Sequence, residues 1–225
     1  MGEFILDLLF PIRCLGCGQE REFICSTCFE EIPLNKEPPL ISQEPTLAGL
    51  MVASDYDYPL VKQAIHRYKY DFVKDLAKPL GQLMIKKLTA TLYRKGTPFI
   101  LIPVPLHKKR LRWRGFNQAE LLAEVISQEI KIPLISNLLV RARHDLPQVQ
   151  IKSSQERKEN IKQAFRINKT RTALAKQGLP LSDLSNKTII LIDDISTTGA
   201  TLEECASVLK PLKPKEIWGL VVARG

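Results

Sequence analysis

The sequence contains no apolar run near the roughly 18 residues that a membrane-spanning helix requires. Histidine is scarce, and the spacing of His66, His107 and His144 fits neither a metal site nor a catalytic triad. Residues 1–10 include two acidic residues and no basic one, which is not the pattern of a secretory signal peptide. These absences argue against transmembrane and secreted proteins, and we expect a cytoplasmic protein without a membrane span.

The composition is that of a globular protein with an excess of positive charge. At about 150 residues per domain, 225 residues predict one full domain and a small accessory element. Apolar residues make up 44% of the chain and charged residues 25%, a typical soluble balance. The formal net charge of +9 favours polyanionic partners, among them nucleic acid, phosphorylated metabolites and anionic membranes.

Four of the five cysteines lie in a C-x2-C-x7-C-x2-C pattern formed by Cys14, Cys17, Cys25 and Cys28. Two residues between the thiolates of each pair let both sulfurs face one point, so two such pairs supply a tetrahedral set of ligands for Zn2+. The alternatives are reduced thiols or two disulfides, and the missing signal peptide argues against disulfides. We therefore predict a structural zinc finger. Cys205 lies in a helical pattern, where we expect a buried apolar side chain.

The chain divides into three parts by composition. Residues 1–35 are expected to form an N-terminal helix and the zinc finger. Four prolines between residues 33 and 45 predict an extended linker over 36–45, because each proline disfavours helix in the residue before it. The main domain is expected over 46–225, and its polar stretch 169–187 is expected to be a surface insertion.

The main domain alternates between strand and helix patterns. Short apolar runs predict buried strands over 50–56, 99–104, 188–192 and 217–222, with weaker candidates at 138–141 and 164–167. Helical spacing predicts helices over 60–70, 73–93, 114–130 and 201–209. This alternation predicts an α/β fold, an open and mainly parallel sheet with helices on both faces.

The segment IILIDDISTTGAT, residues 189–201, places two carboxylates and a Thr-Thr-Gly turn after a buried strand. Ligands of open parallel sheets bind beyond the carboxyl ends of the strands, where we expect Asp193 and Asp194. Gly199 permits a close backbone approach, and the start of the next helix offers free N–H groups to a phosphate. The simpler alternative is an acidic strand end followed by a capped helix.

At these residues the sequence resembles the type I phosphoribosyltransferases, whose signature for 5-phosphoribosyl 1-diphosphate (PRPP) has these elements. With the four-cysteine finger, the resemblance narrows to the ComF family of competence-associated proteins. Supporting strings are Pro103-Val-Pro-Leu, Arg114-Gly-Phe-Asn-Gln118 and the spaced Gln148, Arg157 and Asn160. The resemblance implies the type I phosphoribosyltransferase fold, with a hood formed by residues from about 46 to 72.

The resemblance also implies a role for each matching residue. Asp193 and Asp194 would be the catalytic pair, in contact with the ribose hydroxyls. The 5-phosphate would be held by Ser196, Thr197, Thr198, Gly199, Ala200 and Thr201. The pyrophosphate, together with Mg2+, would face Pro105, Leu106, His107 and Lys108, with Arg112 and Arg114 as further contacts. Residues 144–157 resemble the mobile loop that closes over such a site.

The stretch 107–114 is the most basic part of the chain. Lys108, Lys109, Arg110 and Arg112 can neutralise phosphates while Trp113 offers a stacking face, a combination that suits single-stranded DNA. The alternative is a solvated basic loop that serves only pyrophosphate, and the sequence leaves both open. Residues 66–70 are a weaker candidate, where we expect Tyr68 or Tyr70 to pack in the core.

The resemblance thus implies a zinc-containing, PRPP-binding protein that binds single-stranded DNA during DNA uptake and natural transformation. A DNA translocase or helicase of the competence machinery would be a partner. The alternative is a metabolic phosphoribosyltransferase that transfers ribose 5-phosphate to a base or amine, and a third reading is an inert adaptor. No residue stands out for reading a base edge, so PRPP binding is better supported than transfer.

Overall fold

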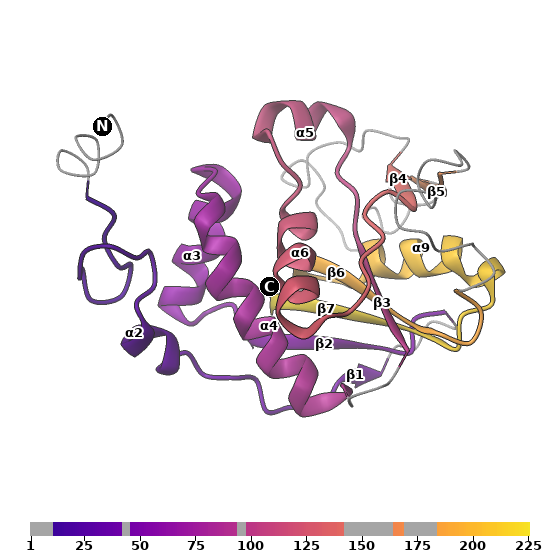
Figure 1. Ribbon diagram of the computed structural model, residues 1–225, viewed down its shortest axis with the longest axis horizontal. Helices are drawn as coiled ribbons and strands as arrows, with labels where there is room; N and C mark the ends of the chain where they lie inside the picture. The colour runs from indigo at the N-terminus through magenta and orange to yellow at the C-terminus, as the bar shows by residue number, and fades with distance from the viewer. Residues whose placement is uncertain (1–10, 42–45, 94–97, 142–163, 169–183) are drawn as a thin grey trace.

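A five-stranded, mainly parallel sheet forms the centre of the protein, as the sequence predicts (Figure 1). The computed structural model describes residues 11–41, 46–93, 98–141, 164–168 and 184–225. Four strands pair in parallel and the edge strand β1 pairs antiparallel with β2. Across the sheet the strands are β1 (Leu40–Ile41), β2 (Gly49–Asp55), β7 (Glu216–Arg224), β6 (Thr188–Ser196) and β3 (Phe99–Pro103).

The central strands carry apolar residues on both faces because both faces are covered. In β6, Ile190 and Ile192 belong to one buried cluster, whereas Ile189 and Leu191 belong to another. Successive side chains of a strand point to opposite faces, so one continuous apolar run supplies two cores. The sheet therefore separates the two hydrophobic cores.

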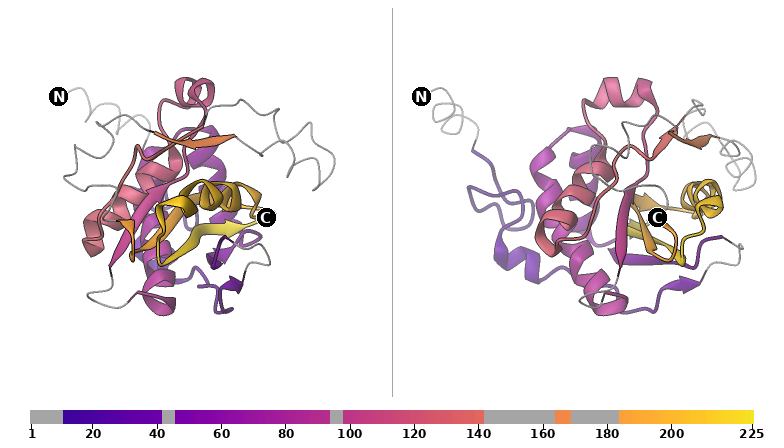
Figure 2. Two further views of the ribbon diagram at one scale, coloured as in Figure 1. Left: turned by 90° about the vertical axis from the view of Figure 1, so that its right-hand side faces the viewer. Right: turned by 45° about the vertical axis from the view of Figure 1, so that its right-hand side comes forward.

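Helices cover both faces, as predicted (Figure 2). One face carries α3 (Pro59–Tyr70), α4 (Ala77–Thr91) and α6 (Gln118–Ile130), and the other carries α9 (Ala200–Leu209). The helix expected over 73–93 is divided, because the 3-10 turn η1 (Lys74–Leu76) precedes α4. Helices α4 and α6 meet closely at Gly81, where a Cβ atom would lie 2.7 Å from Val125 Cγ1. No helix in the described ranges is both long enough and apolar enough to cross a bilayer.

The basic stretch is a helix, α5 (Lys108–Arg114), whereas a solvated loop was one of the two alternatives that the sequence left open (Figure 1). At its start, His107 Nδ1 accepts a hydrogen bond from Lys109 N at 3.2 Å. At its end, Gly115 adopts the left-handed conformation with φ +77°, which glycine tolerates without a steric penalty. The expected helix over 114–130 consequently begins at Gln118.

The two weaker strand candidates do not join the parallel sheet. They form β4 (Leu139–Arg141) and β5 (Phe165–Ile167), which pair antiparallel with each other in a separate two-stranded sheet. Each strand has only three residues, so the sequence pattern was too short to predict which strand each would pair with. The expected N-terminal helix, the loop at 144–157, the residues Gln148, Arg157 and Asn160, and most of the insertion lie outside the described residues.

The finger residues pack on α4 rather than forming a core of their own. Three of the four cysteines are buried in the same cluster as α4. Lys86 of α4 pairs with Glu30 of the short helix α2 (Ser26–Glu30), with Lys86 Nζ 2.8 Å from Glu30 Oε2. The same ammonium lies 4.5 Å from the ring centre of Phe29. These contacts fix the finger against the main domain.

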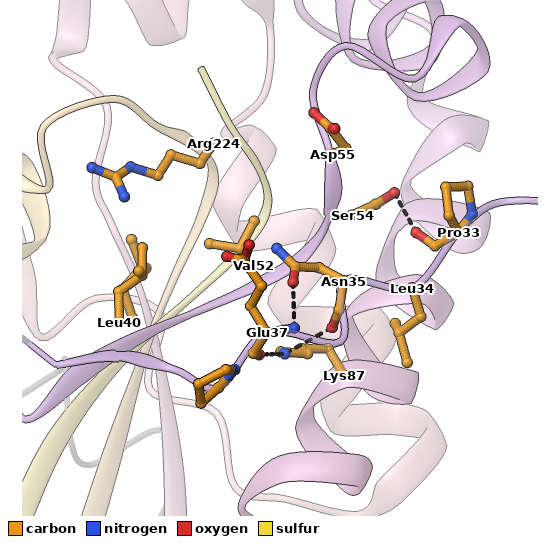
Figure 3. Close-up of a pocket in the computed structure, with 12 residues that line it drawn as sticks. Pro33, Leu34, Asn35, Glu37, Leu40, Val52, Ser54, Asp55, Lys87 and Arg224 are labelled. Atoms are coloured by element: carbon orange, nitrogen blue, oxygen red, sulfur yellow. Dashed lines mark hydrogen bonds between the residues drawn. The ribbon is translucent and has the colours of Figure 1, made fainter.

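The described part of the linker, residues 36–41, contacts the main domain through β1 and Lys87 (Figure 3). Lys87 is almost fully buried in α4. Its ammonium donates hydrogen bonds to Asn35 O at 2.8 Å and to Glu37 O at 2.7 Å. The two carbonyl oxygens replace water around the buried charge, so Lys87 ties the linker to the helix.

Candidate functional site

A cleft of about 420 Å3 opens where β6 and β3 end, bounded by α5 and by the first turns of α6 and α9. It brings together most of the residues that the sequence predicted for the site. The predicted residues that line it are Asp193, Asp194, Ser196, Thr197, Thr198, Gly199, Ala200, Thr201, Pro105, Leu106, Arg110, Trp113 and Arg114.

Four of the predicted residues do not line this cleft. His107 begins α5 and accepts the hydrogen bond that starts the helix. Lys108, Lys109 and Arg112 are exposed on α5, outside the cleft. The helical conformation causes this separation, because one turn directs neighbouring side chains to different sides. The exposed cations are therefore free to meet a ligand on the outer surface.

The acidic pair lies within β6, and not beyond the strand end as expected, because the strand continues to Ser196. Both side chains line the cleft, and the two carboxyl groups lie close enough to interact. Asp194 N donates to Asp193 Oδ1 at 2.9 Å. Burial, followed by the charge of Asp194, raises the pKa of Asp193 to about 7. Asp193 therefore keeps its proton to a higher pH than an ordinary aspartic acid does.

Two cations that the sequence reasoning missed flank this pair. Lys69 of α3 lies with its Nζ 3.0 Å from Asp194 Oδ1, and both side chains are largely buried. Arg141 of β4 contributes a positive charge on the side of Asp193 and stacks over the Phe165 ring at 5.0 Å. Both residues are distant from Asp193 and Asp194 in the sequence, and only the fold brings them to the cleft.

The Thr-Thr-Gly turn leads directly into α9. Gly199 is the N-cap residue with φ +80°, and Ala200 N donates a hydrogen bond to Thr198 Oγ1 at 3.4 Å. The N–H groups of the first turn of a helix have no partner within the helix, so they can bind an anion. Arg224 Nε donates to Thr197 O at 3.3 Å and holds the turn against the end of β7. The turn thus offers donors that suit a phosphate group, and we call residues 196–201 the phosphate turn.

The opposite wall of the cleft offers hydrogen-bond donors. Arg114 Nη1 donates to Gln118 Oε1 at 3.0 Å. Arg114 Nε and Gln118 Nε2 are buried, and neither has a hydrogen-bond partner among the described residues. Burial lowers the pKa of Arg114, while Asp194 opposes this shift, and arginine stays charged at neutral pH. The cleft therefore suits a ligand with hydroxyl groups and more than one anionic group.

The four finger cysteines form a second site. Their sulfur atoms all lie within 4.8 Å of one another, close enough to bind one metal ion. Cys25 N donates to Cys14 Sγ at 3.4 Å, a contact that stabilises a thiolate. A Cβ atom at Gly16 would lie 2.7 Å from Cys28 Sγ, so glycine leaves room for the ligands. Cys205 is remote from this set in the sequence and is fully buried, as predicted.

Known protein families match this chain both over the domain that contains the cleft and over the finger. Residues 117–225 match the model of the phosphoribosyl transferase domain, and residues 5–40 match the double zinc ribbon domain. Competence protein F of Haemophilus influenzae is 30% identical over 219 residues, covering 95% of this chain and 86% of the relative. The DNA utilization protein YhgH of Escherichia coli K12 is 29% identical over 75% of this chain and 69% of its own. Competence protein ComFC of Bacillus subtilis is 37% identical over 49% of this chain and 38% of its own.

The parallel sheet, the acidic pair with its phosphate turn and the four-cysteine cluster define a type I phosphoribosyltransferase-like domain with an N-terminal zinc ribbon. The match to competence protein F spans both parts. The chain belongs to the competence protein F (ComF) family.

Proposed function

We propose that the cleft binds PRPP and that the protein works on single-stranded DNA during DNA uptake. PRPP binding is supported by the position of Asp193 and Asp194 between two walls of the cleft that carry hydrogen-bond donors. The phosphate turn before α9 would take the 5-phosphate, and the acidic pair would accept hydrogen bonds from the ribose hydroxyls. Arg114, on the opposite wall, would take the pyrophosphate.

Magnesium fits this proposal because hard cations prefer oxygen ligands. Carboxylate oxygens of Asp193 and Asp194, together with oxygens of the ligand, are such ligands, and a bound Mg2+ would neutralise charge on the pyrophosphate. If the ribosyl bond breaks, the carboxylates would stabilise the positive charge on the ribose. Arg114 would then stabilise the negative charge on the departing pyrophosphate.

The role in DNA uptake rests on the family and on the charge of α5. Three relatives bear names that refer to competence or DNA utilization. Helix α5 carries five basic residues and no acidic one, and Lys108, Lys109 and Arg112 are exposed. Such a surface neutralises phosphates of a nucleic-acid strand without reading its sequence. A DNA translocase or helicase of the competence machinery is the protein partner that this role implies.

A metabolic phosphoribosyltransferase is the second candidate, because the cleft retains both carboxylates and a buried, unpaired donor at Gln118. The two functions can be distinguished by measuring the release of pyrophosphate and the binding of a DNA strand. Transfer to a base or amine yields pyrophosphate only when the acceptor is present. DNA handling requires strand binding whether or not pyrophosphate is released.

Fluorescence anisotropy of a labelled single-stranded oligonucleotide tests the proposed function. The titration is run at several salt concentrations, with and without Mg2+ and PRPP, and with the charge-reversal variant Lys108→Glu/Lys109→Glu. We expect binding that persists near physiological salt, shifts with PRPP and weakens in the variant. Binding that appears only at low salt would contradict the DNA role and favour a small-molecule enzyme.

A further inference from the structure

Two exposed aromatic side chains stand at the mouth of the cleft. Tyr70, the last residue of α3, is 52% exposed, and Trp113 of α5 is 62% exposed. Both line the same cleft as the acidic pair and the phosphate turn. Large aromatic rings are favoured inside proteins or at interfaces, so two exposed rings beside one cleft indicate a ligand surface. The sequence prediction that Tyr68 or Tyr70 packs in the core holds for Tyr68 alone.

Neighbouring rings support both side chains. Trp113 meets Phe72 edge to face, with ring centres 5.2 Å apart. Tyr70 lies against His66, with ring centres 4.9 Å apart. The Arg114 guanidinium lies 5.8 Å from the ring centre of Tyr70 and 5.8 Å from that of Trp113. One cation thus lies near two rings that come from different helices.

The charge around these rings identifies the kind of ligand. Tyr70 follows Lys69, and Trp113 lies between Arg112 and Arg114. An apolar protein partner would require a broad aliphatic surface, whereas the adjacent exposed aliphatic residue on α5 is Leu111 alone. Aromatic rings interleaved with cations suit bases on a phosphate backbone, because each base offers a flat face and each linkage a negative charge.

We propose that Tyr70 and Trp113 form a base-stacking clamp that holds single-stranded DNA at the mouth of the cleft. The inference rests on the proposed DNA role and assigns that role to one surface. The exposed cations of α5, Lys108, Lys109 and Arg112, neutralise the backbone phosphates of the strand, while Arg114 faces the cleft. Because stacking needs only the flat face of a base, the clamp accepts any sequence. The clamp also places the strand beside the phosphate turn, so strand and PRPP occupy neighbouring space.

The chain has two tryptophans, so a Trp218→Phe background leaves Trp113 as the single indole fluorophore. The protein is titrated with oligo(dT) and with an abasic oligonucleotide of the same length and charge. We expect oligo(dT) to quench Trp113 fluorescence and to bind roughly tenfold more tightly than the abasic strand.

Three variants complete the test by anisotropy. Trp113→Ala and Tyr70→Ala are expected to remove the preference for oligo(dT) over the abasic strand, while Leu111→Ala, an exposed neighbour on α5, keeps it. Equal binding of the two strands by the unmodified protein would overturn the clamp and leave the DNA role intact. Failure of the unmodified protein to bind either strand at physiological salt would overturn both.

Discussion

Lys69 Nζ lies 3.0 Å from Asp194 Oδ1, so the helix α3 is tied directly to the base of the cleft. The side chains are only 16% and 8% exposed, which shields the pair from water and strengthens the attraction. Because Lys69 immediately precedes Tyr70, the same contact positions the residue that we assign to base stacking. The proposed ribose site and the proposed strand path are therefore both positioned by the contact between Lys69 and Asp194.

The pKa of Asp193 predicts a pH-dependent cost to stability. Its folded-state value of about 7 exceeds the unfolded value of about 3.9, so the folded protein retains a proton that the unfolded chain releases. Stability is therefore lost as the pH rises from about 4 to about 7, and little changes above that. Asp193→Asn does not titrate, so its Tm relative to the unmodified protein should increase across this window.

Differential scanning calorimetry at several pH values between 4 and 8 measures this trend. Asp57→Asn is the matched control, because that carboxylate lies on the surface with an 85% exposed side chain. We expect its Tm difference to stay nearly constant. A constant difference for Asp193→Asn as well would contradict the raised pKa.

The finger should bind about one zinc per chain. Removing zinc with a chelator is expected to lower the Tm, because the finger packs against α4 and relies on the metal for its own fold. Cys17→Ser is the informative variant, since Cys17 is exposed and its loss leaves no cavity in the core. Elemental analysis should show less zinc in this variant and a full complement in Cys205→Ala. Full zinc content in Cys17→Ser would contradict the four-cysteine site.

The close contact between Gly81 and Val125 predicts that Gly81→Ala destabilises the unmodified protein but stabilises a variant without the Val125 side chain. A methyl group at Gly81 would lie 2.7 Å from Val125 Cγ1, so Gly81→Ala should cost about 1 kcal/mol of stability through overpacking. In a Val125→Gly background, which removes both Val125 Cγ1 and Val125 Cβ, the space is open, and the same change should add up to about 1 kcal/mol through helix propensity. Urea unfolding of the four proteins measures both effects. Equal effects in the two backgrounds would contradict the close packing of α4 and α6.

Much of the parallel sheet and the grouping of the residues at both candidate sites could be predicted from local sequence. The run from Ile189 to Ile192 is apolar on both faces, and this pattern occurs in a buried parallel strand. The metal site of the cysteines is also predictable from local sequence, because two residues between the cysteines of a pair let both sulfurs face one ion. In both cases the decisive residues are neighbours in the chain.

The missed features depend on contacts between distant residues. Nothing near Lys69 in the sequence indicates its pairing with Asp194, because α3 and β6 are separated by most of the main domain. Helix α5 was not predicted, because its seven residues, mostly basic, show no apolar face. Likewise, the hydrogen bonds from Lys87 to Asn35 O and Glu37 O form only because folding brings α4 next to this segment.

The most direct test of the account is isothermal titration calorimetry of PRPP with Mg2+ present, comparing the unmodified protein with Asp193→Asn/Asp194→Asn. The double variant keeps the size of both side chains, and thermal unfolding serves as the control that it is folded. We predict saturable binding near one PRPP per chain and a loss of at least roughly tenfold in affinity in the variant. Unchanged affinity in a folded variant would contradict the role of the acidic pair in the PRPP site.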